Sequence, residues 1–241
     1  MRAVGSTMAS GSFAAVSAAD GSCSLADFTV SGYTAPSWNE DDEEYVDGCG
    51  SGDFIIQFLT RSGTVESRYY WIDNGEVAAG WYNTDGSAIE GGAASVVIEA
   101  GKAAWIKGNG FTLVSAGAVN ENDIAYTTRT VGSSAVGNAT PVNLTLGKLT
   151  VSGYDAPEWN EDDEEYVDGC GSGDFIVQFL TRSGTVEARY YWIDNGELAA
   201  GWYTPAGTAI EGGATSVSVP AGQGMWIKGN GLQLNIPAPE L

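Results

Sequence analysis

An internal repeat constrains this chain more than any other feature of its sequence. The tetrapeptide Val30-Ser31-Gly32-Tyr33 returns as Val151-Ser152-Gly153-Tyr154, 121 residues further on, and this spacing holds without a gap to the C-terminus. Each repeat is long enough to bury a hydrophobic core of its own. We therefore expect an N-terminal segment at 1–10, module 1 at 11–117, an inter-module segment at 118–134 and module 2 at 135–241.

Each repeat carries short runs of alternating apolar and polar residues, which is the period of a β-strand. The chain also has 34 Gly and only 17% charged residues, as is typical of short strands joined by tight turns. The sequence predicts an all-β fold of two tandem homologous modules, each a β-sandwich or a partly open barrel. The expected strands of module 1 are 25–30, 53–60, 64–72, 76–82, 95–98, 104–107 and 111–113, and the last three are expected to form a meander.

Differences between the two copies indicate which side chains face solvent. Val97 is replaced by Ser218 in the second copy, whereas its neighbours Val96 and Ile98 correspond to the apolar Val217 and Val219. Adjacent side chains of a strand point to opposite faces. We therefore expect Val97 to point outward and its two neighbours to point inward.

The inter-module segment suggests two ways in which strands could pair. Residues 124–128 have the composition of a strand and are expected to pair with a sheet edge of the same chain or of a neighbour. Leu241 corresponds to Asn120, so the N-terminal segment of a second molecule could follow Leu241 in a head-to-tail assembly. The other interpretation is that any tandem duplication ends in this way.

The net charge of the chain restricts the classes of molecule that it can bind. The chain has 31 Asp plus Glu against 10 Lys plus Arg, a formal net charge of -21, so phosphate backbones and anionic membranes repel it. It also has no apolar run long enough to span a bilayer. We expect no nucleic-acid partner and no membrane span, which leaves cations, basic surfaces and neutral glycans.

Each repeat contains a loop crowded with carboxylates, at 39–48 and again at 160–169. Repulsion among them is relieved by solvent or by a bound cation, and Ca²⁺ suits them because it prefers many oxygen ligands. The spacing does not match an EF-hand, so a solvated loop and a Ca²⁺ site both stay open. The candidate metal ligands are Glu40, Asp41, Asp42, Glu43, Glu44, Asp47, Glu161, Asp162, Asp163, Glu164, Glu165 and Asp168.

Aromatic residues recur beside these loops. In Tyr69-Tyr70-Trp71 neighbouring side chains must face opposite sides of a strand, so at least one aromatic per copy lies outside the core. Outward aromatics anchor protein interfaces or stack on sugar rings, and we favour an interface. The candidates are Trp38, Tyr45, Tyr70, Trp159, Tyr166 and Tyr191.

The three cysteines allow several arrangements. Cys49 repeats as Cys170, whereas Leu144 stands at the position that matches Cys23. Three free thiols, a Cys23–Cys49 bridge within module 1, and a Cys23–Cys170 bridge to a neighbouring molecule all stay open.

Catalytic groups are scarce. The chain has no His, which excludes Ser-His-Asp and Cys-His sites and any zinc site with a His ligand. A hydrolase could use a pair of carboxylates from Glu40, Asp42 or Glu44, but the repeat would then duplicate a complete active site in a small module. We therefore expect no enzymatic activity.

Two elements of each repeat resemble a known group of proteins. Gly80-Trp81-Tyr82 and the stretch from Ala100 to Gly110 are similar to parts of uncharacterised secreted tandem β-module proteins of verrucomicrobia-like bacteria. The resemblance implies an extracellular or cell-surface location, and a virion protein is the alternative. It implies no activity and no functional residues, and the start of the chain lacks the Leu-rich centre of a secretory signal.

The repeat, the acidic composition and the scarcity of catalytic groups together favour a non-enzymatic structural protein. We expect a subunit of an extracellular filament, surface layer or virus particle, assembled as a homo-oligomer or homopolymer through its β-modules. The alternative is an adhesin or carbohydrate-binding protein with two acidic, Ca²⁺-stabilised modules, in which two copies raise the avidity.

Overall fold

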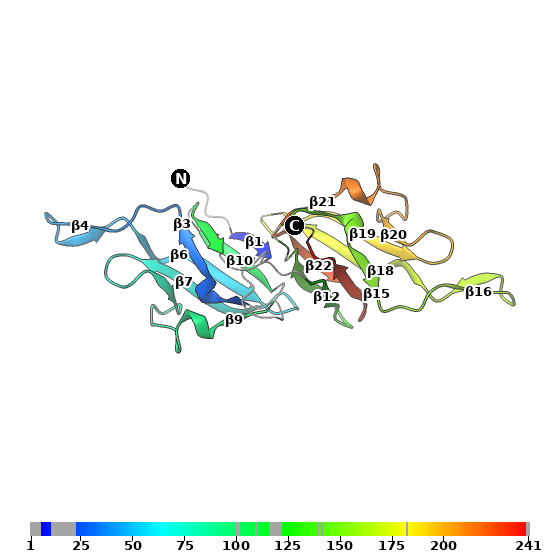
Figure 1. Cartoon of the computed structure of the whole chain (residues 1–241), viewed down its shortest axis with the longest axis horizontal. Helices are drawn as coiled ribbons and strands as arrows, with labels where there is room; N and C mark the ends of the chain where they lie inside the picture. Colours follow the sequence, from blue (N-terminus) through cyan, green and yellow to red (C-terminus); the bar gives the residue numbers. More distant parts are fainter. Residues whose placement is uncertain are drawn as a thin grey trace.

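The computed structural model describes residues 6–10, 23–99, 102–108, 110–115, 122–138, 140, 142–181 and 183–239. Within these ranges the chain forms β-strands and four single turns of 3-10 helix. None of the helical turns in these ranges is long and apolar enough to cross a membrane. The predicted all-β fold is confirmed, and so are the two tandem modules, which follow one another along the long axis (Figure 1).

Each module is built on one five-stranded antiparallel sheet. The strand order is β1-β10-β6-β7-β8 in module 1 and β13-β22-β18-β19-β20 in module 2. The strands of module 1 are β1 (Ser6–Ser10), β6 (Cys49–Leu59), β7 (Val65–Asp73), β8 (Gly80–Tyr82) and β10 (Ala103–Gly108). Those of module 2 are β13 (Ser134–Gly137), β18 (Cys170–Leu180), β19 (Val186–Asp194), β20 (Gly201–Tyr203) and β22 (Gly224–Lys228).

Pairs of short strands form a second layer in each module. In module 1 these are β3 (Phe28–Ser31) with β11 (Thr112–Ser115), and β2 (Cys23–Ser24) with β9 (Val97–Ile98). Module 2 has β15 (Thr150–Ser152) with β23 (Gln233–Ile236), and β14 (Leu144–Thr145) with β21 (Ser218–Val219). The core lies between the layers, where Phe54 and Ile56 of the large sheet share one buried cluster with Phe28 and Val30 of β3.

The predicted meander is wrong. Its three stretches do form the strands β9, β10 and β11, but these pair with β2, β6 and β3 rather than with one another. The reason is that β10 belongs to the large sheet, while β9 and β11 belong to the other layer. The predicted orientation of β9 is confirmed, because Val97 is 68% exposed and Ile98 only 2%.

Two tryptophans in each module join its layers. Trp71 on β7 lies edge-on to Trp81 on β8, with ring centroids 5.4 Å apart. The indole N–H of Trp81 then donates a hydrogen bond to the carbonyl of Phe28 in the second layer, at 2.8 Å. A buried indole N–H would be costly without such a partner. Module 2 repeats both contacts through Trp192, Trp202 and the carbonyl of Leu149.

The two modules contact each other through equivalent residues. The turn at Gly63 in module 1 lies against the ring of Trp226 in module 2, and Gly184 in module 2 lies against Trp105 in module 1. Gly63 and Gly184 occupy the same position of the repeat, and so do Trp105 and Trp226. Such reciprocal contacts define a two-fold interface, in which both partners use the same face.

A small apolar cluster lies between the modules beside these rings. Leu59 and its equivalent Leu180 are buried there with Ala103 and Ala135. The backbone N–H of Ala135 also donates to the carbonyl of Arg61, at 2.9 Å. The interface therefore combines apolar packing with a backbone hydrogen bond between modules.

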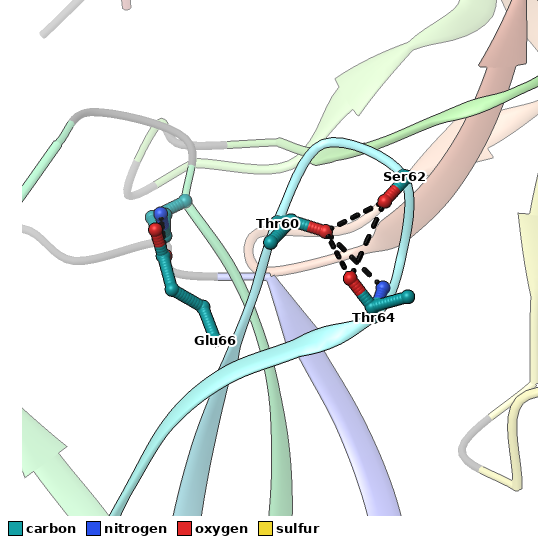
Figure 2. Close-up of polar contacts among 5 residues, drawn as sticks. Thr60, Ser62, Thr64 and Glu66 are labelled. Carbon is teal, nitrogen blue, oxygen red and sulfur yellow. Dashed lines mark hydrogen bonds and ion pairs between the residues drawn. The ribbon is translucent and has the colours of Figure 1, made fainter.

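Hydroxyl groups shape the turn that receives Trp226 (Figure 2). Thr60 Oγ1 lies 2.8 Å from Ser62 Oγ and 2.7 Å from Thr64 Oγ1. The backbone N–H of Thr60 donates to the carbonyl of Thr64 at 2.8 Å and closes the turn. Just beyond it, Glu66 forms an ion pair with Lys102. These bonds hold the turn in shape before the ring of the other module packs on it.

The strand expected in the inter-module segment is confirmed. β12 (Ile124–Thr127) pairs antiparallel with β23 and extends the second layer of module 2 to three strands. Ile124 and Tyr126 are buried in the core of that module. The segment therefore belongs to module 2 of its own chain.

The contact between the two modules is not of the head-to-tail kind, and the head-to-tail assembly of separate molecules considered from the sequence stays a prediction. A head-to-tail series needs two different faces that fit each other, whereas here one face of each module meets the same face of the other. Further modules cannot be added by repeating this contact, because both faces are already used.

Replacing Gly63 with alanine should weaken the contact between modules. The new Cβ would overlap the ring of Trp226, and the φ of +83° at this residue adds backbone strain. In the control Gly86→Ala, φ is +81° but no atom lies within 4 Å of the added Cβ. We expect the free energy of unfolding to fall by about 2–3 kcal/mol in Gly63→Ala and about 1 kcal/mol in the control, in urea denaturation. Equal losses would contradict the contact.

Candidate functional site

The acidic loop of each repeat folds as a β-hairpin that projects from its module. In module 1, β4 (Ser37–Asn39) pairs with β5 (Glu44–Val46), and in module 2, β16 (Glu158–Asn160) pairs with β17 (Glu165–Val167). Figure 1 shows β4 and β16 at opposite ends of the molecule. We call 37–46 and 158–167 the acidic hairpins.

An asparagine shapes the tip of each acidic hairpin. Asn39 Oδ1 accepts the backbone N–H of Asp41 at 3.0 Å, and Asn39 Nδ2 donates to Asp42 Oδ2 at 2.7 Å. Glu43 completes the turn with a φ of +53°, in the left-handed region that residues other than glycine seldom adopt. Module 2 repeats these features at Asn160 and Glu164. Local hydrogen bonds therefore define the tip.

The carboxylates of the tips do not converge on a common point. The residues from Glu40 to Glu44 are all exposed, and in the described ranges no group of three His, Cys, Asp or Glu could hold a metal ion. Exposed carboxylates keep their hydration, which screens their mutual repulsion. The arrangement fits the solvated-loop interpretation. The described side chains form no ready set of ligands for the Ca²⁺ site predicted at Glu40–Asp47 and Glu161–Asp168.

An exposed aromatic pair lies on the stem of each hairpin. Trp38 and Tyr45 stand opposite each other on the paired strands, edge to face, with ring centroids 5.1 Å apart. Trp38 is 53% exposed and Tyr45 43%, and Trp159 and Tyr166 repeat this geometry at 53% and 42%. Apolar surface of this kind beside charged groups is typical of a contact site.

A glycine in the neighbouring turn positions the pair. The ring of Tyr45 lies against Gly75 so closely that any Cβ there would overlap it, and Gly75 has a φ of +83°. Gly196 receives the ring of Tyr166 in the same way. At the base of the hairpin, Gly48 N–H donates to the carbonyl of Thr34 at 2.9 Å. Tyr45 therefore anchors the hairpin to its module, while Trp38 stays outside.

The other two predicted contact aromatics, Tyr70 and Tyr191, lie elsewhere. Each is half-buried in its large sheet, opposite Tyr82 or Tyr203 on the next strand. Their neighbours in sequence turn to the other face, where Tyr69 packs against the core and Trp71 belongs to it. The structure thus brings Trp38 together with Tyr45, and not with Tyr70.

A polar chain runs from each core toward the surface. Trp71 Nε1–H donates to the hydroxyl of Tyr33 at 3.0 Å, and that hydroxyl donates to Asp73 Oδ2 at 2.8 Å. Burial raises the pKa of Tyr33; the Trp71 hydrogen bond opposes the rise and Asp73 adds to it. The same chain recurs from Trp192 through Tyr154 to Asp194. Its position between the layers suits a structural role.

A small cavity lies where the modules meet. Its lining includes Leu59, Arg61 and Lys102 of module 1 together with Tyr126 and Ala135. Its volume is about 40 Å³, which suits a water molecule rather than an organic substrate.

All three cysteines are buried free thiols. The Cys23–Cys49 bridge considered from the sequence is not formed in the structure. The Cys23–Cys170 bridge would join two molecules and stays a prediction. Burial raises the pKa of each thiol to about 12, and Asp27 adds to the rise at Cys23. The thiolate is the reactive form of cysteine, so these side chains act as core residues.

Sequence reasoning missed the glycines that receive aromatic rings. Gly63 follows Ser62 and Gly75 follows Asn74, and Ser-Gly and Asn-Gly dipeptides mark turns. The dipeptide reveals the turn, but it carries no information about the ring that packs on it. Trp105 and Trp226 gave no signal either, because an apolar residue in a strand is usually part of its own core.

Comparison of the chain with protein-family models, with curated proteins and with solved structures gives no match. The resemblance to secreted tandem β-module proteins therefore stays a prediction.

Gly75→Ala should detach the first acidic hairpin from its module. The added Cβ would displace the ring of Tyr45, and a loosened hairpin opens to proteases more often. We expect a glutamate-specific protease to cleave between residues 40 and 44 about tenfold faster than in the unmodified protein. Gly86→Ala, with similar φ and no neighbouring ring, should leave the rate unchanged, and an unchanged rate in Gly75→Ala would show that Tyr45 is not the anchor.

The buried thiols should make the protein less stable at alkaline pH. Their pKa is about 12 in the folded chain, against 9.0 for an ordinary thiol. Below about pH 9 both states keep the proton, and above it the unfolded chain releases protons that the folded chain retains. We expect the free energy of unfolding to fall from about pH 9 toward pH 12, and to fall less steeply in Cys49→Ala with Cys170→Ala. Urea denaturation across this pH range measures both slopes, and identical slopes would refute the assignment.

Proposed function

We propose that the protein is a non-enzymatic structural protein, a subunit of an extracellular filament, surface layer or virus particle, which contacts neighbouring copies through its acidic hairpins. The duplicated Trp–Tyr pair supports this function most directly. Trp38 and Trp159 are each 53% exposed on projecting hairpins, and a large exposed aromatic is better stabilised when a partner covers it.

The contact between modules supports a linking role. It places the two equivalent hairpins at opposite ends of the molecule (Figure 1). One molecule can therefore contact two neighbours at once and hold them at a fixed separation. Two such contact points per subunit are sufficient for an extended assembly.

Charge sets the conditions for such contacts. With a formal net charge of -21, two copies repel each other until salt screens their charges. The aromatic part of the contact is apolar and keeps its strength in salt. Self-assembly through the hairpins should therefore increase with ionic strength, whereas binding to a basic partner should weaken.

A second candidate function is carbohydrate binding by an adhesin. The exposed ring of Trp38 stands beside carboxylates that can accept hydrogen bonds from sugar hydroxyls. Binding on a glycan array that is lost in Trp38→Ala with Trp159→Ala, by a protein that stays monomeric, would favour this function over assembly.

Removing both hairpin tryptophans should abolish assembly. We expect the unmodified protein to form larger species as concentration and salt rise, Trp38→Ala to stop at short species, and Trp38→Ala with Trp159→Ala to remain monomeric. Sedimentation velocity and electron microscopy measure the species. Val131→Ala is the control, because Val131 is 78% exposed but lies outside the hairpins. An unmodified protein that remains monomeric at every concentration and salt level would end the proposal.

A further inference from the structure

Module 2 fills a strand position that no described strand of module 1 fills. The second layer of module 2 has the order β12-β23-β15, whereas the described strands of the matching layer in module 1 are β11 and β3. β11 and β23 are equivalent, because Leu113 and Leu234 occupy the same position of the repeat. Among the described residues, only β3 pairs with β11.

The side chains beneath this position differ between the modules. Leu234 and Ile227 are 0% exposed in module 2, where β12 adds Tyr126 to the same core cluster. Their equivalents in module 1, Leu113 and Ile106, are only partly buried at the margin of the core. The apolar surface that β12 covers in module 2 is therefore more exposed in module 1, where no described strand covers it.

The backbone of β11 is also turned toward the open side. In module 2 the N–H of Thr128 donates to the carbonyl of Leu232 at 2.8 Å, which fixes the phase of the β12–β23 ladder. Alternate residues of an antiparallel strand exchange hydrogen bonds with the same neighbour, so Leu234 bonds toward β12. Its equivalent Leu113 therefore directs its N–H and carbonyl at the open edge. An edge of this kind is a template for another strand.

We infer that the outer edge of β11 accepts a β-strand from another polypeptide. The filled site of module 2 describes the occupant: an extended segment antiparallel to β11, with apolar side chains at alternate positions, as Ile124 and Tyr126 are in β12. Charge adds one requirement, since a chain with a formal net charge of -21 favours a segment without net negative charge. This mode of recognition combines backbone hydrogen bonds with side-chain pockets. It stands apart from the acidic hairpins and does not rest on the proposed function.

A cysteine in place of Val114 can report the register in which an incoming strand pairs with β11. Its equivalent, Asn235, lies opposite Ala125 of β12, between the hydrogen-bonded pairs of the ladder. Cα atoms at such a pair approach to about 4.5 Å, within the reach of a disulfide. Val114 is 41% exposed, so a cysteine there would be accessible to an incoming strand.

The test uses Val114→Cys in the full chain and a synthetic peptide with the sequence of residues 122–130. With Cys in place of Ala125, the peptide should form a disulfide with Val114→Cys under mild oxidation, while the buried native thiols stay unmodified. Asn235→Cys is the matched control, because β12 already fills that edge, and we expect it to react at least about tenfold more slowly. A peptide with Cys in place of Tyr126 tests the register, since that side chain faces the core, and it should not cross-link.

Three results would overturn the inference. The first is no cross-link at Val114→Cys, and the second is equal cross-linking at Val114→Cys and Asn235→Cys. The third is a disulfide between two Val114→Cys chains that forms faster than the one with the peptide, since a second copy would then occupy the edge. The cross-link should still form in a chain that also carries Trp38→Ala and Trp159→Ala. A missing cross-link would therefore contradict the strand-binding inference without contradicting assembly through the acidic hairpins.

Discussion

The shape of this molecule depends on two tryptophan rings that pack on two glycine turns. Trp226 packs on Gly63 and Trp105 on Gly184, and each turn can receive its ring only because it has no side chain. Flexibly joined modules would let the acidic hairpins move independently. The reciprocal contact instead holds them at opposite ends of one body (Figure 1). It is also the reason that the two halves of the chain, nearly identical in sequence, point in different directions.

Sequence reasoning placed the strands better than it placed their partners. Alternation shows that 104–107 is extended, but it does not show that β10 lies in one layer and β9 and β11 in the other. That separation is decided by which apolar faces can meet across a core. The orientation of Val97 could be predicted because the second copy has Ser218 there. The differences between two copies of a duplication show which positions tolerate a substitution. This comparison is most informative at exposed positions, where polar replacements are tolerated.

The candidate site was predictable in composition but not in geometry. The sequence located the carboxylates and the aromatic pair Trp38 and Tyr45, because both stand out by residue type. It could not reveal that Tyr45 rests on Gly75, since that contact joins residues distant along the chain. For the same reason the three cysteines left several pairings open, and within one chain all three are buried as free thiols. The outer edge of β11, which pairs with no described strand, could not be predicted for a different reason. It becomes evident only when the folded modules are compared.

The two-fold contact between modules also limits how such a chain can grow. A module has one face of this kind, and that face is satisfied by a single partner. Modules of this type are therefore complete in pairs. A chain with a third repeat would leave one tryptophan and one glycine turn without their counterparts, as exposed apolar surface. Lengthening by duplication is therefore favoured in steps of two modules, and a stable chain of this kind has an even number of repeats.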